Sequence, residues 1–163
     1  MATRDRHLPL ADMSAGDVLS FAEDQHATRL TAERAILEAA YQWAVLHSPD
    51  SLAASDKRGR ERAKPAGAEG TPRITEHAAA TFGARIQTSP YGAKRLIADA
   101  VDLHHRLPKL WAGVKAGQVR VGHARRVAEA TRELSAEQAG WVDAEVVEIA
   151  DGRLAWARFE DVV

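Results

Sequence analysis

The histidines are the residues of this 163-residue chain best suited to acid–base or metal chemistry near neutral pH. His104 and His105 are adjacent in the segment DLHHRLP, so on a helix they point to different faces and cannot chelate one metal as a pair four residues apart would. His123 lies 18 residues further along, beyond a break in the helical pattern. We therefore predict no metal site and no cofactor, and we interpret these histidines as structural or phosphate-contacting.

Nucleophilic catalysis has no better support in the sequence. The chain contains no cysteine, which excludes disulfides, thiolate zinc sites and cysteine nucleophiles. No serine stands in a strained turn after a strand, and local context marks no histidine–aspartate partner for one. The expectation is a protein without catalytic residues, and not an enzyme.

The net charge of −1 hides a strong asymmetry along the chain. Residues 85–126 contain nine Lys and Arg against two acidic residues, whereas residues 127–163 contain three against nine. A basic block of this kind favours a polyanion-facing surface, with double-stranded DNA as the partner. The alternative is that the acidic ends of the chain fold against the block and neutralise it. The candidate phosphate-contacting residues are Arg85, Lys94, Arg95, Arg106, Lys109, Arg125 and Arg126.

The elements that must position these side chains are predicted to be helices. A long helix over residues 15–47 follows Ser14 and Asp17, and it has no internal proline. Leu30, Leu37 and Ala44 recur every seven residues on it, so this stripe packs either inside the monomer or on a second copy in a homodimer.

Residues 48–74 carry three prolines and three glycines with few large apolar groups, and they are predicted to form a basic flexible linker. Its charged cluster comprises Lys57, Arg58, Arg60, Arg62 and Lys64. A helical domain over residues 75–163 is expected to follow. Its helices are expected from Thr75 to about Gln87, from Ser89 to a stop before Pro108, then over PKLWAGVKAG, VGHARRVAEAT, AEQAGWVDAEVVEIA and RLAWARFEDVV. No stretch shows sustained strand alternation, so the fold class is all-α.

The start of the second of these helices, TSPYGAKRLI at residues 88–97, resembles the entry to a DNA-reading helix. In a helix-turn-helix element Gly83 allows two helices to approach, and Lys94 and Arg95 fall on the exposed face. Gln87 departs from the pattern, because a glycine commonly allows the sharp turn there. The alternative is an ordinary capped helix. Trp111, Trp141 and Trp156 lie on apolar helical faces and are expected to pack in the core.

The motifs LHHRLPKLW, AGQV, ARRVAEAT and GRLAWARFE follow one another in order across residues 76–160. In this order they resemble the helical domain of unknown function 222, which is found in actinobacteria at the front of many HNH endonuclease proteins of mobile-element type. The resemblance implies an all-helical, DNA-associated accessory region and supplies no catalytic residues. A protein-interaction or dimerisation scaffold that packs against a nuclease domain supplied elsewhere is the alternative function.

A nuclease site of the HNH type needs histidines held by an asparagine, and this chain contains no asparagine. We therefore expect a chain truncated at its C-terminal end, without the nuclease part. The first residues include no apolar run long enough for a signal peptide, and no stretch approaches the roughly 18 apolar residues of a membrane helix. The expected location is the cytoplasm, with no membrane contact.

Overall fold

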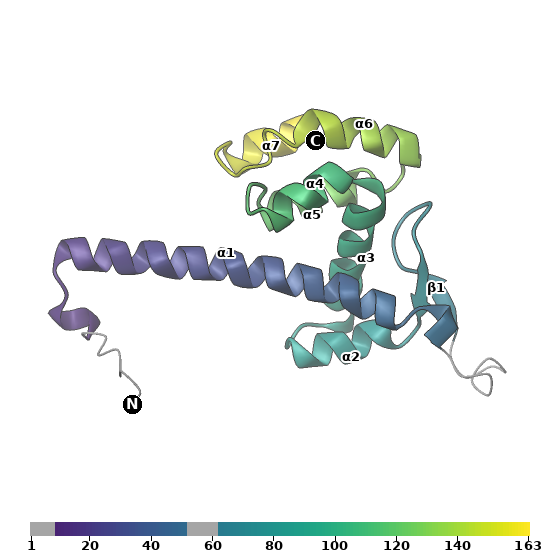
Figure 1. The fold of residues 1–163 in the computed structure, drawn as a ribbon, viewed down its shortest axis with the longest axis horizontal. Coiled ribbons are helices and arrows are strands. Elements are labelled where there is room, and N and C mark those ends of the chain that lie inside the picture. The colour runs from purple at the N-terminus through teal and green to yellow at the C-terminus, as the bar shows by residue number, and fades with distance from the viewer. Residues whose placement is uncertain (1–8, 52–61) are drawn as a thin grey trace.

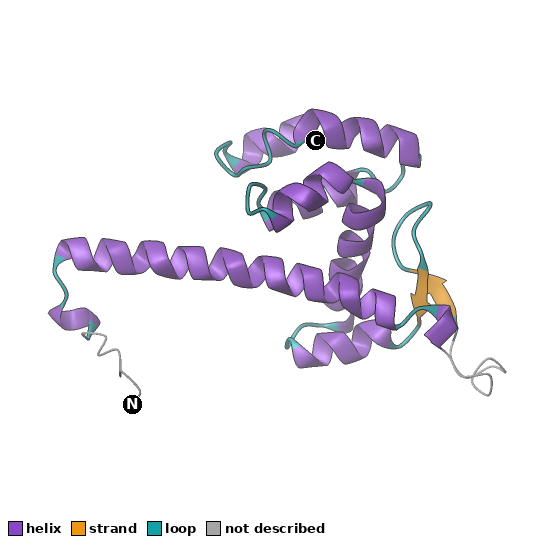
Figure 2. Ribbon diagram, in the orientation of Figure 1, coloured by secondary structure: helices purple, strands orange, loops and turns teal. Residues whose placement is uncertain are grey.

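The computed structural model describes residues 9–51 and 62–163, which form a helical bundle with one long helix extending from it (Figure 1; Figure 2). The α-helices are α1 (Ala15–Leu46), α2 (Ala78–Arg85), α3 (Pro90–Arg106), α4 (Pro108–Lys115), α5 (Val121–Ala130), α6 (Ala136–Val146) and α7 (Trp156–Val162). The short elements are the 3-10 helices Leu10–Asp12 and Pro49–Ser51 and the strands β1 (Ala63–Pro65) and β2 (Arg73–Thr75). Helix α3 is central and packs against α1, α2, α4, α5 and α6. The all-α class is confirmed.

Helix α1 begins where the sequence predicts it, at a capping box formed by Ser14 and Asp17. The Ser14 hydroxyl accepts a hydrogen bond from the Asp17 amide, and the Asp17 carboxylate accepts one from the Ser14 amide, both at 3.2 Å. These bonds satisfy amides that the first turn of a helix leaves without partners. The buried residues of α1 are Leu37, Ala40 and Ala44, all in its C-terminal half. Leu37 and Ala44 of the predicted stripe therefore belong to the core of the monomer.

Part of the predicted flexible linker is a β-hairpin, which corrects that expectation for residues 62–74. Strands β1 and β2 pair antiparallel, with Ala63 opposite Thr75. The pair is too short for the period-two pattern that identifies a strand in sequence. The residues Lys57, Arg58 and Arg60 of the predicted basic cluster lie outside the described residues.

Helix α2 begins later than predicted, because Thr75 belongs to strand β2 instead of capping a helix. The Thr75 amide donates to the carbonyl of His47 at 2.9 Å, which ties the hairpin to the end of α1. The N-cap of α2 is His77, whose side chain makes no capping hydrogen bond.

The turn between α2 and α3 has the sharp, left-handed geometry that a glycine usually adopts, although this sequence has a glutamine there. Gln87 adopts a left-handed backbone with φ of 56°, at the position where the sequence analysis noted a missing glycine. Gly83 lies at the close approach of the two helices, since a Cβ there would come within 2.9 Å of the Ala93 Cβ. Ser89 then caps α3 by accepting a hydrogen bond from the Gly92 amide at 3.0 Å, with Pro90 in the first turn, as predicted.

Replacing Gln87 with glycine should stabilise the fold. A left-handed backbone costs a non-glycine residue about 1–2 kcal/mol, and glycine loses part of that gain through the entropy of the unfolded chain. We expect the free energy of unfolding to rise by about 0.5–1 kcal/mol in urea titration. The matched control is Arg85→Gly in the last turn of α2, which should lower stability by about 1 kcal/mol. A destabilised Gln87→Gly variant would contradict the assigned backbone.

The later helix boundaries also follow local signals. Gly117, with φ of 75°, ends the segment after α4, and its amide donates to the Val114 carbonyl at 2.9 Å. Ser135 and Gln138 form the capping box predicted for α6. These features confirm the helices whose caps are visible in the sequence.

The core is made mostly of small and aliphatic side chains from α1 to α6, with Phe159 contributed by α7. The tryptophan expectation is wrong for two of the three residues, since Trp141 is 67% exposed and Trp156 is 45% exposed. Trp111 is half-buried and packs against the core as expected. Among the described residues, no helix is long and apolar enough to cross a membrane.

Candidate functional site

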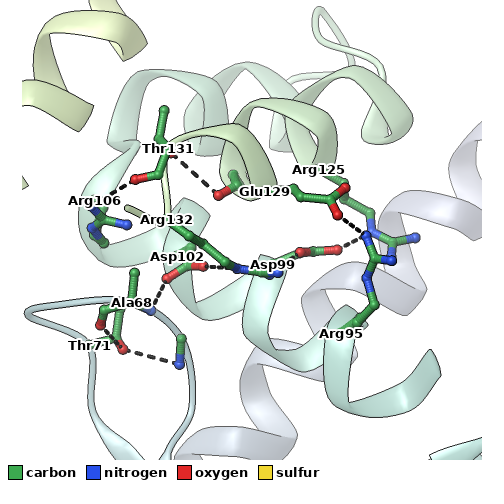
Figure 3. Close-up of polar contacts among 12 residues, drawn as sticks. Ala68, Thr71, Arg95, Asp99, Asp102, Arg106, Arg125, Glu129, Thr131 and Arg132 are labelled. Atoms are coloured by element: carbon green, nitrogen blue, oxygen red, sulfur yellow. Dashed lines mark hydrogen bonds and ion pairs between the residues drawn. The ribbon is translucent and has the colours of Figure 1, made fainter. Parts of the chain in front are cut away.

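Two buried aspartates and two partly exposed arginines form an ion-pair network between α3 and the region of α5 (Figure 3). Asp99 and Asp102 of α3 are 2% and 0% exposed. The Arg125 Nε donates to Asp99 at 2.7 Å, and Arg132 donates to Asp99 through Nη2 and to Asp102 through Nε at 3.1 Å. We call these four residues the Asp99–Asp102 network.

The hairpin loop closes directly on this network. The Ala68 amide donates to Asp102 Oδ1 at 2.7 Å. A Cβ on Gly67 would lie only 2.2 Å from the same oxygen, so the loop backbone approaches the carboxylate more closely than any side chain would permit. Asp102 therefore joins three segments that are distant in sequence: the hairpin, α3 and the turn after α5.

The pKa values show how burial and pairing compete in the network. Burial raises the pKa of Asp99 above its ordinary value, while hydrogen bonds and charges from Arg125 and Arg132 act to lower it. Burial by itself would lower the pKa of Arg132, but the hydrogen bonds and negative charges of Asp102 and Asp99 outweigh it and raise that pKa. Arg132 is therefore held as a cation, as a buried carboxylate pair requires.

Arg106 corrects the predicted set of phosphate-contacting residues. It is 3% exposed, and its Nη2 donates to the carbonyl oxygens of Thr131 and Leu134 at 3.1 and 2.5 Å. The guanidinium thus stabilises the turn between α5 and α6 from inside the protein. A buried group in this position cannot contact a phosphate, because the backbone of the protein covers it.

Three more of the predicted cations are paired with acidic side chains of the same chain. Arg95 pairs with Glu129, and Arg125 pairs with Asp99. Arg126 pairs with Glu160 of α7, with 3.4 Å between Nε and Oε1. Glu129 and Glu160 belong to the acidic C-terminal part of the chain, as the alternative to a polyanion-facing surface requires, whereas Asp99 lies within the basic block itself.

The remaining predicted cations, Arg85, Lys94 and Lys109, are exposed. Arg85 lies in the last turn of α2 and Lys94 in the second turn of α3, on the two sides of the α2–α3 turn. Lys109 lies at the start of α4, where its backbone amide donates to Asp143 at 2.8 Å. Lys109 is thus separated in the fold from the first two.

The burial of α3 limits what this helix can present to a partner. Every residue from Ile97 to Leu103 is buried, so the helix is covered on all sides beyond its second turn. A recognition helix lies in the DNA major groove, which demands one accessible face. Only the two ends of α3 remain accessible: Tyr91 is 70% exposed beside Lys94 in the first turns, and His105 is exposed in the last turn.

The histidines lie among aromatic side chains. His104 stacks on Tyr41 with 4.0 Å between ring centroids, and the His123 ring packs edge-on against Phe159 at 4.4 Å. Burial lowers the pKa of both histidines, which favours their neutral forms. Within the described part of the chain, no group of histidines and acidic residues could hold a metal ion.

The buried acids were not predicted from the sequence as structural residues. Asp99, Asp102 and Asp143 each lie among apolar helical neighbours, and all three are at most 2% exposed. Their signal in the sequence is a carboxylate on the inward face of an amphipathic helix, as in LIADAVDL. That pattern indicates a buried charge that needs a partner, but it does not say which arginine supplies it.

The N-terminal half of α1 forms a second candidate site, an arm that projects beyond the other helices (Figure 1). We define the arm as residues 15–26. Its side chains are exposed except for a half-buried Phe21, and Leu19 is 67% exposed. Leu30 and Leu37 are 11 and 18 residues after Leu19, about three and five turns of helix, so the three leucines share one face. The face of α1 that packs in the core at Leu37 therefore reaches Leu19, where the protein leaves it uncovered, with Glu23 and His26 on the same face between Leu19 and Leu30.

A groove adjoins this face where α1 meets the bundle. Two neighbouring hollows of about 420 and 200 Å³ share Leu30 and Arg120 in their walls. Val121 and Trp156 add apolar surface opposite α1. We call the two hollows together the α1–α5 groove.

Fold and site together define a mostly helical bundle protein whose elements are joined by ion pairs to buried carboxylates and which carries an exposed helical arm. The chain belongs to the family described as Domain of unknown function (DUF222), whose model matches residues 48–159. This match confirms the family to which the sequence motifs pointed. Comparison with curated proteins and with solved structures found no match.

Proposed function

We propose that this chain is a non-catalytic interaction module, in which the bundle holds the arm of α1 in place for docking on another protein. The observation that carries the proposal is the apolar face of α1, which is buried at Leu37 and exposed at Leu19. A helix on the surface normally buries its apolar face against its own protein. Covering exposed apolar surface stabilises a complex by about 25 cal/mol per Å² before the costs of association.

The internal ion pairs favour this function over a purely electrostatic one. Arg95, Arg125 and Arg126 face acidic groups of the same chain, and Arg106 is buried. Phosphate contacts by these groups would require displacing partners that already neutralise them. The family resemblance implies an association with HNH endonuclease proteins. A nuclease domain supplied elsewhere is therefore one partner that the arm would bind. The lack of cysteine agrees with a location in the reducing cytoplasm.

Thiol labelling tests the proposal, because the chain has no cysteine of its own. A single cysteine at position 19 should react slowly with a maleimide in the producing cell, where a partner covers it, and rapidly in dilute purified protein. The matched control is Thr28→Cys, nine residues away and therefore on the opposite face of the helix, where exposure persists in both samples. Equal reactivity of the two sites inside the cell would refute docking on this face.

DNA binding is the second candidate, and the exposure of Arg85 and Lys94 on the two sides of the α2–α3 turn favours it. Tyr91 and Arg95 adjoin Lys94 there, with the Arg95 guanidinium 5.9 Å from the Tyr91 ring centre. In this function the cations would position the protein on phosphates of the duplex, and base reading would be confined to the first turns of α3.

Salt dependence of duplex binding tests this second candidate. The logarithm of the binding constant should fall linearly with the logarithm of salt concentration, with a slope of about −0.9 per phosphate neutralised. Replacing Arg85 and Lys94 with alanine should reduce the slope by up to about two units and leave the thermal midpoint nearly unchanged. Arg153 and Arg158 are exposed elsewhere, so their double alanine variant is the control. Lack of duplex binding even at about 50 mM salt would exclude this function.

A further inference from the structure

The charges of the arm and of the α1–α5 groove are opposite, and this determines which partner the arm fits. The arm carries Asp17, Glu23 and Asp24, and no Lys or Arg occurs between residues 9 and 28. The basic residues that line the groove outside the arm are Arg29, Arg34 and Arg120, and its acidic residue is Glu33, which pairs with Arg29.

The apolar surfaces match as well as the charges. Val18 and Leu19 of the arm are 40% and 67% exposed. Leu30, Val121 and Trp156 line the groove. An acidic helix with exposed aliphatic side chains is therefore complementary to the groove in both charge and polarity.

The arm cannot occupy the groove of its own chain. Arm and groove wall belong to the same uninterrupted helix α1 (Ala15–Leu46), so residues 15–26 extend away from residues 29–34 and cannot fold back beside them. An arm can reach such a groove only from another molecule.

We propose that the partner of the arm is a second copy of this chain, with the arm of each copy lying against the α1–α5 groove of the other. This inference rests on the proposed interaction function. Reciprocal docking makes the two α1 helices antiparallel and closes the assembly as a two-fold dimer, because the same surface is used on both copies. Leu19 supplies the apolar anchor, and Glu23, one helical turn after it on the same face, faces the cations of the groove.

Sedimentation velocity of the purified chain tests the dimer. The wild-type chain of 17.7 kDa should sediment as a species of twice that mass at sufficient concentration. Leu19→Glu should raise the dissociation constant by about 30-fold or more, because a charge replaces a central apolar contact. Thr28→Glu, on the opposite face, should leave the dissociation constant nearly unchanged. Circular dichroism checks that each variant retains its helix content.

Charge reversal gives the sharper test. Glu23→Lys reverses the charge of the arm on its docking face, and Arg29→Glu with Arg34→Glu reverses the groove; each of these two variants alone should be monomeric. In an equimolar mixture the reversed arm meets the reversed groove and the native arm meets the native groove, so a heterodimer should form. A mixture that stays monomeric while the wild-type chain dimerises would overturn the pairing of arm with groove.

Two further outcomes separate this inference from the function on which it rests. A wild-type chain that remains monomeric at every concentration overturns the second copy as partner. If the cysteine at position 19 is nevertheless protected in the producing cell, the interaction function stands with a different protein on the arm. A dimer that is insensitive to Leu19→Glu and to both charge reversals also overturns the inference, because another surface then holds the copies together.

Discussion

Replacing Arg132 with alanine should lower the free energy of unfolding by about 3 kcal/mol, as measured by urea denaturation. Removal of one partner from a buried ion pair typically costs about 3–5 kcal/mol, because the remaining charge stays buried without compensation. Here Asp102 would keep only the Ala68 amide, and Asp99 would keep only Arg125. The Arg132 side chain is 25% exposed, which places the expected loss at the lower end of that range.

Two companion variants make this result specific to the network. Arg153→Ala removes an ion pair with Asp151 whose arginine is 93% exposed, so stability should change by no more than about 0.5 kcal/mol. Adding Asp102→Asn to Arg132→Ala should recover part of the loss, because a neutral amide costs less to bury than an unpaired carboxylate. A loss below about 1 kcal/mol for Arg132→Ala would show that water compensates the carboxylates and that the network does not hold the bundle together.

Leu37→Ala and Leu19→Ala should have very different effects, although the two leucines share one face of one helix. Leu37 is 0% exposed, and truncating a buried leucine costs about 2–5 kcal/mol through lost burial and the cavity that remains. Leu19 is 67% exposed, so its truncation should change monomer stability by no more than about 0.5 kcal/mol. The comparison is made by chemical denaturation in dilute solution, where association does not contribute.

The expected difference locates the boundary between core and arm within α1. Equal losses for the two variants would mean that the arm is part of the monomer core. Small losses for both would mean that α1 contributes little to the bundle. Either result would contradict the division of α1 on which the interaction function depends.

Helices were predictable where their ends carry local chemistry. Ser14, Ser89 and Ser135 cap α1, α3 and α6 by accepting hydrogen bonds from the amides three residues later, and proline opens α3. These interactions span less than one turn, so residue types alone indicate them. The left-handed turn before α3 was also visible, since the pattern called for glycine at the position that Gln87 occupies.

Other features depend on contacts between segments that are distant in the chain. The hairpin is held by pairing between short strands and by the bond from Ala68 to Asp102, 34 residues away. Arg106 and Lys94 are both basic residues of α3. Arg106 is buried because the turn between α5 and α6 packs over it, whereas Lys94 is exposed. Periodicity likewise placed Trp141 on an apolar stripe but could not show that no other helix covers it.

The most direct measurement is the maleimide labelling rate of a cysteine at position 19, compared between the producing cell and dilute purified protein. The interaction function requires a rate in the cell that is at least about tenfold lower, because a partner that binds the arm populates the covered state for most of the time. The rate at Thr28→Cys should be the same in both samples. If position 19 reacts as fast in the cell as in dilute solution, the apolar face of the arm is uncovered where the protein works, and the account given for it is wrong.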